Sequence, residues 1–119
     1  GLQIVEPGYK KSRIAPLVGS GGLSQARCSL RTPYGLLASE WKLANDELTL
    51  TVTVPANTSA EVVIPAASAE MVREGKSPAR SARGVEKSAF KDGQLTMLVS
   101  SGRYEFTVRK SNLQTFWRR

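Results

Sequence analysis

The residue types that most often perform chemistry in proteins are scarce in this chain. Its 119 residues include a single cysteine, Cys28, and no histidine. Serine and cysteine nucleophiles that depend on a histidine base are therefore excluded. One cysteine without histidine also provides neither an internal disulfide nor the usual tetrahedral zinc site. We therefore expect no metal site and no cofactor.

The acidic residues are the remaining candidates for catalysis. A glycosidase acting by itself needs two carboxylates placed across a sugar, roughly 5–9.5 Å apart. The glutamates that stand out occupy polar positions of expected strands or turns: Glu40, Glu47, Glu61 and Glu105. A solvated carboxylate is the simpler interpretation of each, so we assign no catalytic residue and expect no enzymatic activity from this chain alone.

The elements that position these side chains are predicted to be strands. From Leu48 to Val54, apolar residues alternate with threonine, a pattern typical of a strand with one buried face. The same period of two predicts further strands at 26–30, 34–43, 62–64, 95–99 and 104–108. Segments rich in glycine, proline, asparagine and aspartate separate them. Strands at this spacing indicate an all-β sandwich or barrel.

Two side chains in these strands are predicted to lie in the core. Cys28 falls between Ala26 and Leu30 at apolar positions, and Trp41 shares a strand face with Leu37. We expect Cys28 to behave as a small buried hydrophobic group rather than as a reactive thiol. We expect Trp41 to pack in the core rather than to stack on a sugar.

The length favours one domain spanning residues 1–119. The least organised stretch is 66–84, where residues 70–74 could form a short strand and residues 75–83 are expected to be an exposed loop. Residues 110–119 are expected to be a tail.

The chain is basic, with 17 lysines and arginines against 10 acidic residues and a formal charge of +7. Such a charge can mark a nucleic-acid-binding surface. Here the basic residues are spread along the chain, and no helix-turn-helix, zinc-finger or aromatic RNA-binding motif accompanies them. A solvated basic surface explains the pattern, so we expect no specific nucleic-acid partner.

The apolar runs are only a few residues long, far short of the ~20 residues that a membrane-spanning helix needs. We therefore expect no membrane partner. The first residues do not have the pattern of a signal peptide, and the compartment stays open.

Four short motifs occur in a characteristic order: GYKKSRIAP at residues 8–16, YGLLASEW at 34–41, VPANTSA at 54–60 and SGRYEF at 101–106. Together they resemble the C-terminal domain of bacterial α-L-rhamnosidases. The stretch 66–84 contributes least to this resemblance, and residues after Val108 contribute nothing.

The resemblance implies an antiparallel β-sandwich of about eight strands. In the family, such a domain follows a helical α/α barrel, whose glutamates hydrolyse terminal α-L-rhamnose from glycans. That barrel is absent from this sequence, so no catalytic residue of the family can be placed here. The resemblance favours a periplasmic or extracellular parent enzyme, with the barrel as partner of this domain.

Two functions follow from the resemblance and the residues. The first is a structural domain that packs against the barrel, with an interdomain surface near the start of the chain formed by Leu2, Ile4, Tyr9 and Ile14. For Ile4 and Ile14, an ordinary first strand in the core is the alternative. The second is a carbohydrate-binding module with glycan as partner, in which Tyr34 or Trp117 stacks on sugar.

Overall fold

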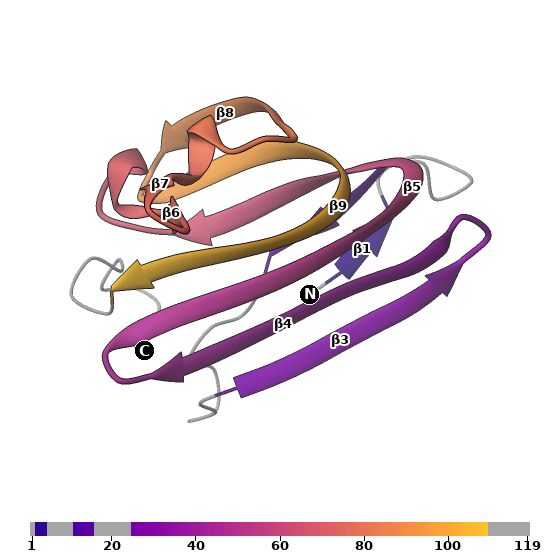
Figure 1. The fold of residues 1–119 in the computed structure, drawn as a ribbon, viewed down its shortest axis with the longest axis horizontal. Coiled ribbons are helices and arrows are strands. Elements are labelled where there is room, and N and C mark those ends of the chain that lie inside the picture. The colour runs from indigo at the N-terminus through magenta and orange to yellow at the C-terminus, as the bar shows by residue number, and fades with distance from the viewer. Residues whose placement is uncertain (1, 5–10, 16–24, 110–119) are drawn as a thin grey trace.

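The computed structural model describes residues 2–4, 11–15 and 25–109, the first of these segments by its backbone. Nearly all of the described chain is strand, as Figure 1 shows. The nine strands are β1 (Leu2–Ile4), β2 (Lys11–Ile14), β3 (Gln25–Thr32), β4 (Gly35–Ala44), β5 (Glu47–Pro65), β6 (Arg73–Glu74), β7 (Ser77–Pro78), β8 (Val85–Lys91) and β9 (Gln94–Arg109). Two short 3-10 helices, η3 (Ala69–Met71) and η4 (Ala79–Ser81), lie between β5 and β8. The all-β fold expected from the sequence is confirmed.

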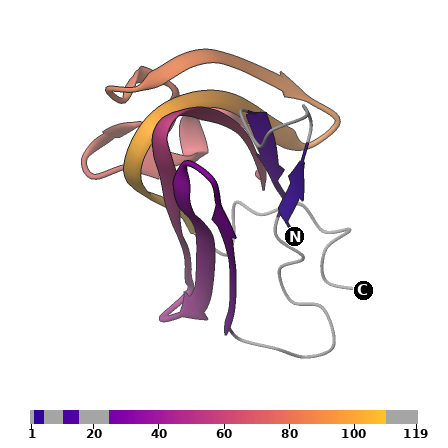
Figure 2. The same cartoon turned by 90° about the vertical axis from the view of Figure 1, so that its right-hand side faces the viewer.

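The two longest strands, β5 and β9, pair with each other in antiparallel fashion and run through both halves of the molecule. The first half of β5 also pairs with β4, which pairs with β3, and the end of β9 reaches β6. The second half of β5 pairs with β2, and the start of β9 pairs with β8. Figure 2 shows both long strands curving over, so that one continuous sheet forms two layers.

Tight turns set the register of the neighbouring strands. Asn45 and Asp46, with φ of 53° and 62°, link β4 to β5, and Asp92 and Gly93, with φ of 52° and 76°, link β8 to β9. Two successive residues of positive φ are typical of the two-residue hairpin turns that match strand twist. The two segments that the sequence predicted to be turns therefore connect adjacent antiparallel strands.

The core lies between the two layers. Every even position from Leu48 to Val54 is buried, and Trp41 is only 4% exposed, as the period of two predicts. The opposite layer contributes residues from β2, β5 and β9, with Ile14 and Val62 fully buried. The core cluster also includes four residues of the stretch between β5 and β8: Ala66, Ala69, Val72 and Ala79. The prediction that residues 75–83 form an exposed loop is therefore wrong in part. This stretch contains β7 and η4, and Ala79 at the start of η4 is buried in the core.

The strand boundaries differ from the prediction in two respects. The segments 48–54 and 62–64 belong to one strand, β5, and 95–99 and 104–108 belong to one strand, β9. The structure also has strands that alternation did not indicate, of which β8 is the longest. One pairing, between β2 and β5, is parallel, whereas all the others are antiparallel.

Cys28 is exposed, so the prediction of a buried thiol is wrong. In the register, Cys28 lies opposite Ser39, which is buried, so the period of two identified its face correctly. However, among the described strands β3 pairs with β4 alone and therefore lies at an edge of the sheet. Leu30 on the same face of β3 is 37% exposed for the same reason.

Candidate functional surfaces

The motifs at 54–60 and 101–106 meet at the bend of the two long strands. Val54 pairs with Gly102 and Ser59 with Ser100, so β5 has extra residues between these two pairs. The extra segment is closed by Thr58, whose Oγ1 donates a hydrogen bond to the Pro55 carbonyl oxygen at 2.7 Å. Such a bulge bends and twists the strand that contains it. These motif residues therefore shape the curved sheet.

Tyr104 fixes the β9 side of the bend. Its Oη donates a hydrogen bond to the Ser100 carbonyl oxygen at 2.6 Å, and its ring stacks on Phe106 with centroids 5.8 Å apart. Gly84, with φ of 93°, lies directly against this ring, because a Cβ at that position would be 2.3 Å from Tyr104 Oη. The Gly84 carbonyl oxygen in turn accepts a hydrogen bond from the Ser100 amide at 2.9 Å.

The other two motifs also reach this bend. A Cβ at Gly35 would be 3.2 Å from the Pro55 Cβ, so the turn between β3 and β4 packs closely on β5. Strand β2 begins at Lys11, which pairs with Ser59 just beyond the bend. The four motifs that are separated in sequence thus converge on one structural feature. The described motif residues at this bend make structural contacts with one another.

The candidate interdomain residues have different positions in the structure. Ile14 is fully buried in the core, which fits the alternative of an ordinary first strand for this residue. Leu2 and Ile4 belong to β1, which pairs with β2 at Ile14 and Ser12; their side chains lie outside the description, as does Tyr9. Backbone pairing therefore places Leu2 opposite Ile14 and Ile4 opposite Ser12.

Of the two candidate sugar-stacking residues, the structure describes Tyr34, whereas Trp117 lies outside the described residues. Tyr34 lies in the turn between β3 and β4 and is 37% exposed. The Tyr34 backbone amide donates a hydrogen bond to Thr32 Oγ1, which in turn donates to the Gly35 carbonyl oxygen. Tyr34 is thus presented on a well-ordered turn.

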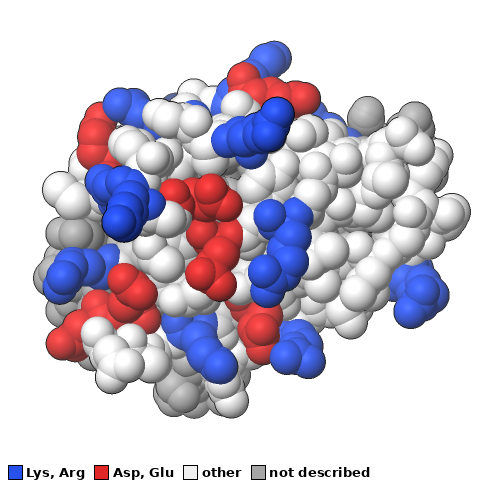
Figure 3. Space-filling model, viewed as in Figure 1, with Lys and Arg blue, Asp and Glu red and all other residues white. Residues whose placement is uncertain are grey.

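Charged side chains of both signs are interspersed over the face that Figure 3 shows. Arg27 on β3 contacts Glu40 on β4, with Nη2 and Oε2 2.8 Å apart. The hydrogen bond and charge of Arg27 lower the pKa of Glu40, and Lys42 and Arg103 add smaller effects in the same direction. A phosphate backbone is bound by a continuous basic surface, and the mixed charges on this face do not form one.

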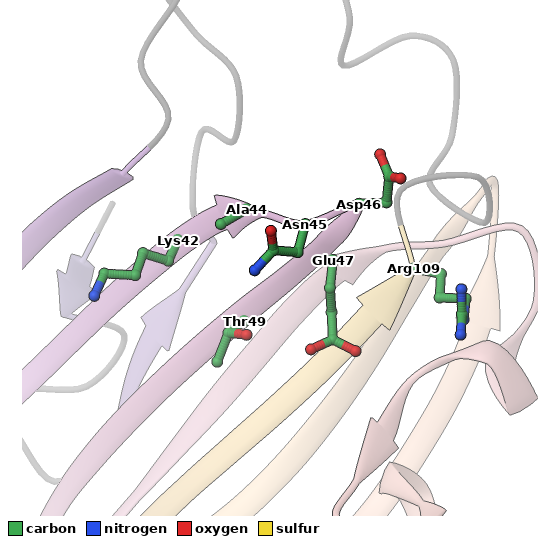
Figure 4. A pocket seen from close by; sticks show the side chains of 7 residues that line it. All are labelled: Lys42, Ala44, Asn45, Asp46, Glu47, Thr49 and Arg109. Atoms are coloured by element: carbon green, nitrogen blue, oxygen red, sulfur yellow. The ribbon is translucent and has the colours of Figure 1, made fainter.

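A shallow, open pocket of about 270 Å³ lies at the turn between β4 and β5. Its lining is polar and carries both signs of charge: Lys42, Ala44, Asn45, Asp46, Glu47, Thr49 and Arg109. Figure 4 shows the carboxylates of Asp46 and Glu47 pointing in opposite directions. A pair of glycosidase carboxylates must instead face one substrate. The pocket therefore does not have the arrangement of a glycosidase active site.

Within the described part of the chain, no three histidine, cysteine, aspartate or glutamate side chains gather in a way that could hold a metal ion. The same part contains no helix that is long and apolar enough to cross a membrane.

The fold therefore defines a β-sandwich domain. Comparison with known families assigns it further, because residues 1–79 match the family model described as the bacterial α-L-rhamnosidase C-terminal domain. An α-L-rhamnosidase of Formosa agariphila is 32% identical over 93% of this chain, and one of Streptomyces avermitilis is 32% identical over 91%. The chain belongs to the bacterial α-L-rhamnosidase C-terminal domain family.

Solved structures agree with this assignment. The crystal structure of the Streptomyces avermitilis α-L-rhamnosidase complexed with L-rhamnose matches 91% of this chain with a TM-score of 0.76 and 28% identity. The α-L-rhamnosidase of Dictyoglumus thermophilum matches 92% with a TM-score of 0.74 and 27% identity. The chain spans only 10% and 12% of these two structures, and 12% of the Formosa agariphila relative.

Proposed function

We propose that this chain is a non-catalytic domain that packs against the catalytic domain of an α-L-rhamnosidase and stabilises it. The observation that carries the proposal is the convergence of the family motifs on the bend at Pro55, where they hold the sheet in shape. The small share of each relative that the chain covers supports the proposal, since the chemistry of the whole enzyme then belongs to the larger remainder. The partner in this proposal is the α/α barrel of the same polypeptide.

The entering segment is one part of the proposed contact. Strand β1 lies beside β2 at the edge of its layer, so Leu2 and Ile4 remain candidates for an interdomain surface, together with Tyr9. Ile14 is not included, because its side chain is already enclosed within this domain.

The test is to delete this domain from the parent enzyme and measure turnover of an aryl α-L-rhamnoside and the temperature of half-inactivation. We expect the soluble truncated enzyme to keep its kcat within about threefold but to lose activity at a clearly lower temperature. A truncated enzyme of unchanged heat stability would contradict the stabilising role. A properly folded truncated enzyme without turnover would contradict the non-catalytic role.

A carbohydrate-binding function is the second candidate, and the exposure of Tyr34 on an ordered turn favours it. Aromatic rings that bind sugars do so through an accessible face, so Tyr34→Ala should weaken retention of the 119-residue chain on rhamnose-containing polysaccharide. Equal migration of the chain in affinity gels with and without that polysaccharide would contradict this candidate.

A further inference from the structure

The exposed large hydrophobic side chains of the described residues are unevenly distributed. They are Leu30, Tyr34, Leu36, Met71 and Phe90. Met71 and Phe90 are isolated from each other in sequence and element, but the first three lie within the tip of the β3–β4 hairpin, which we define as residues 30–36. The exposed apolar side chains of the described residues thus concentrate at this hairpin tip.

Each face of the hairpin tip carries one exposed leucine. Leu30 lies opposite Leu37 in the register and shares the core-side face of the sheet, whereas Leu36 lies opposite Arg31 on the other face. Leu30, Tyr34 and Leu36 are between 37% and 42% exposed, and Tyr34 lies at the turn between the two leucines. A partner that covers all three side chains must therefore surround the tip rather than lie flat against the sheet.

Contacts within and beside the hairpin tip hold the backbone of its turn. The hydrogen bonds of Thr32 Oγ1 close the turn, and Gly35 packs against Pro55 at the bend. A turn whose backbone is already held in shape before binding loses less conformational entropy when a partner covers it. The tip thus has the properties of a preformed anchor.

Charge is low at the same place. Arg31 is the one charged residue between 30 and 36, and the end of the molecule at the turn between β3 and β4 is largely uncharged in Figure 3. The buried centres of protein interfaces are depleted in charge and enriched in aromatic side chains. The composition of the hairpin tip therefore fits an interface centre better than a solvated loop.

The outer edge of β3 lies next to the hairpin tip. Within the described residues, β3 pairs with β4 alone, so one edge of its eight residues offers unpaired backbone groups. An exposed edge strand beside apolar side chains invites association with other chains, and proteins usually cover or blunt such edges. A partner seated at the hairpin tip would shield part of this edge.

We propose that the hairpin tip is the anchor by which this domain docks into an apolar cleft of the remainder of its parent polypeptide. This inference rests on the proposed packing function and names the surface that performs it. The length of the relatives indicates what the hairpin tip contacts. Relatives that match more than nine-tenths of this chain have only 10–12% of their own residues in the matching region. The larger remainder is the one partner always present at equal concentration.

Cys28 provides a native probe of this docking, because it is exposed on β3 two residues from Leu30. We would measure its alkylation by iodoacetamide at peptide level in the parent protein and in the 119-residue chain. The matched control is a Ser88→Cys variant, which places a thiol at an exposed position of β8. Docking predicts that alkylation of Cys28 is at least about tenfold slower in the parent, while alkylation at position 88 changes less than about twofold.

A substitution tests the anchor itself. In the parent protein, Leu36→Asp should increase hydrogen exchange in residues 30–36 and lower the temperature of half-inactivation. Phe90→Asp is the matched control, since Phe90 is 39% exposed and Leu36 is 42% exposed, and it should change neither quantity.

The outcomes separate the two proposals. If other surfaces of the domain are protected in the parent but Cys28 and residues 30–36 are not, the domain packs and the hairpin anchor is wrong. If no surface is protected, the packing function itself fails. If the 119-residue chain forms a dimer that already protects Cys28 and residues 30–36, the occupant is a second copy, and the assignment to the parent polypeptide is overturned.

Discussion

The contact between Gly84 and Tyr104 offers a quantitative test of how the bend is held. Replacing Gly84 by alanine would place its Cβ 2.3 Å from Tyr104 Oη and 3.0 Å from Cε1. These distances are too short, and the ring is enclosed because Tyr104 is only 5% exposed. The ring must therefore move, and its hydrogen bond to the Ser100 carbonyl oxygen is lost.

The expected cost has two parts. An alanine at the φ of 93° that Gly84 adopts costs about 1–3 kcal/mol of backbone strain. Loss of a hydrogen bond that leaves a partly buried carbonyl unsatisfied costs about 1–3 kcal/mol more. We therefore expect Gly84→Ala to lower the free energy of unfolding by about 2–6 kcal/mol, which is a large fraction of the stability of a small domain.

The assay is urea denaturation followed by far-ultraviolet circular dichroism, with Tyr104→Phe as a second background. Gly75→Ala is the matched control, because Gly75 has a φ of 65° but no atom within 4 Å of an added Cβ; it should cost only about 1–2 kcal/mol. Since Tyr104→Phe removes the closest contact, Gly84→Ala should cost at least about 1 kcal/mol less in that background. Equal costs in both backgrounds, or a cost no larger than that of Gly75→Ala, would refute this account of the bend.

Three further predictions concern the core, the exposed ion pair and the charge. Trp41→Ala should cost about 3–5 kcal/mol because its side chain is buried in the core, and a nearly unchanged urea midpoint would contradict its place there. Glu40→Gln should reduce stability slightly at pH 7, and this reduction should shrink as the pH falls. Because Arg27 lowers the pKa of Glu40, the carboxylate contributes stability above its unfolded-state pKa, and this contribution is lost as the pH falls through its folded-state pKa. A difference in urea midpoint between wild type and Glu40→Gln that grows on acidification would have the wrong sign. Duplex DNA should bind weakly, with affinity that vanishes at physiological salt, and sub-micromolar binding there would contradict the passive interpretation of the charge.

Most of the fold could be predicted from local pattern. Alternation in the segment from Leu48 to Val54 identified both the strand and its buried face, because a period of two is the direct consequence of strand geometry. The pairs Asn45-Asp46 and Asp92-Gly93 were recognisable as turns because these residue types tolerate positive φ.

The continuity of β5 and β9 could not be predicted in the same way. Pro55 and Gly102 each resemble the end of a strand, whereas the structure accommodates both in a bulge that bends the pair without breaking it. The parallel pairing of β2 with β5 joins residues far apart in sequence, and no local pattern encodes such a partner. Strand β8 was missed because most of its residues are exposed, so its sequence lacks apolar alternation.

The candidate site shows the same division between local and long-range information. Periodicity placed Cys28 and Leu30 on the correct face of β3, but it cannot tell whether that face is covered. Exposure depends on the position of β3 at the sheet edge, which is a property of the assembled fold. The apolar character of the hairpin tip therefore became visible only in the structure.

Turnover of an aryl α-L-rhamnoside by the purified 119-residue chain tests whether this domain contributes a catalytic group. We predict no hydrolysis above the buffer rate, because the described carboxylates lie on exposed faces and turns and, in the pocket, Asp46 and Glu47 diverge. Turnover that persists through repurification and disappears when one of the chain's own carboxylates is replaced by its amide would contradict this prediction.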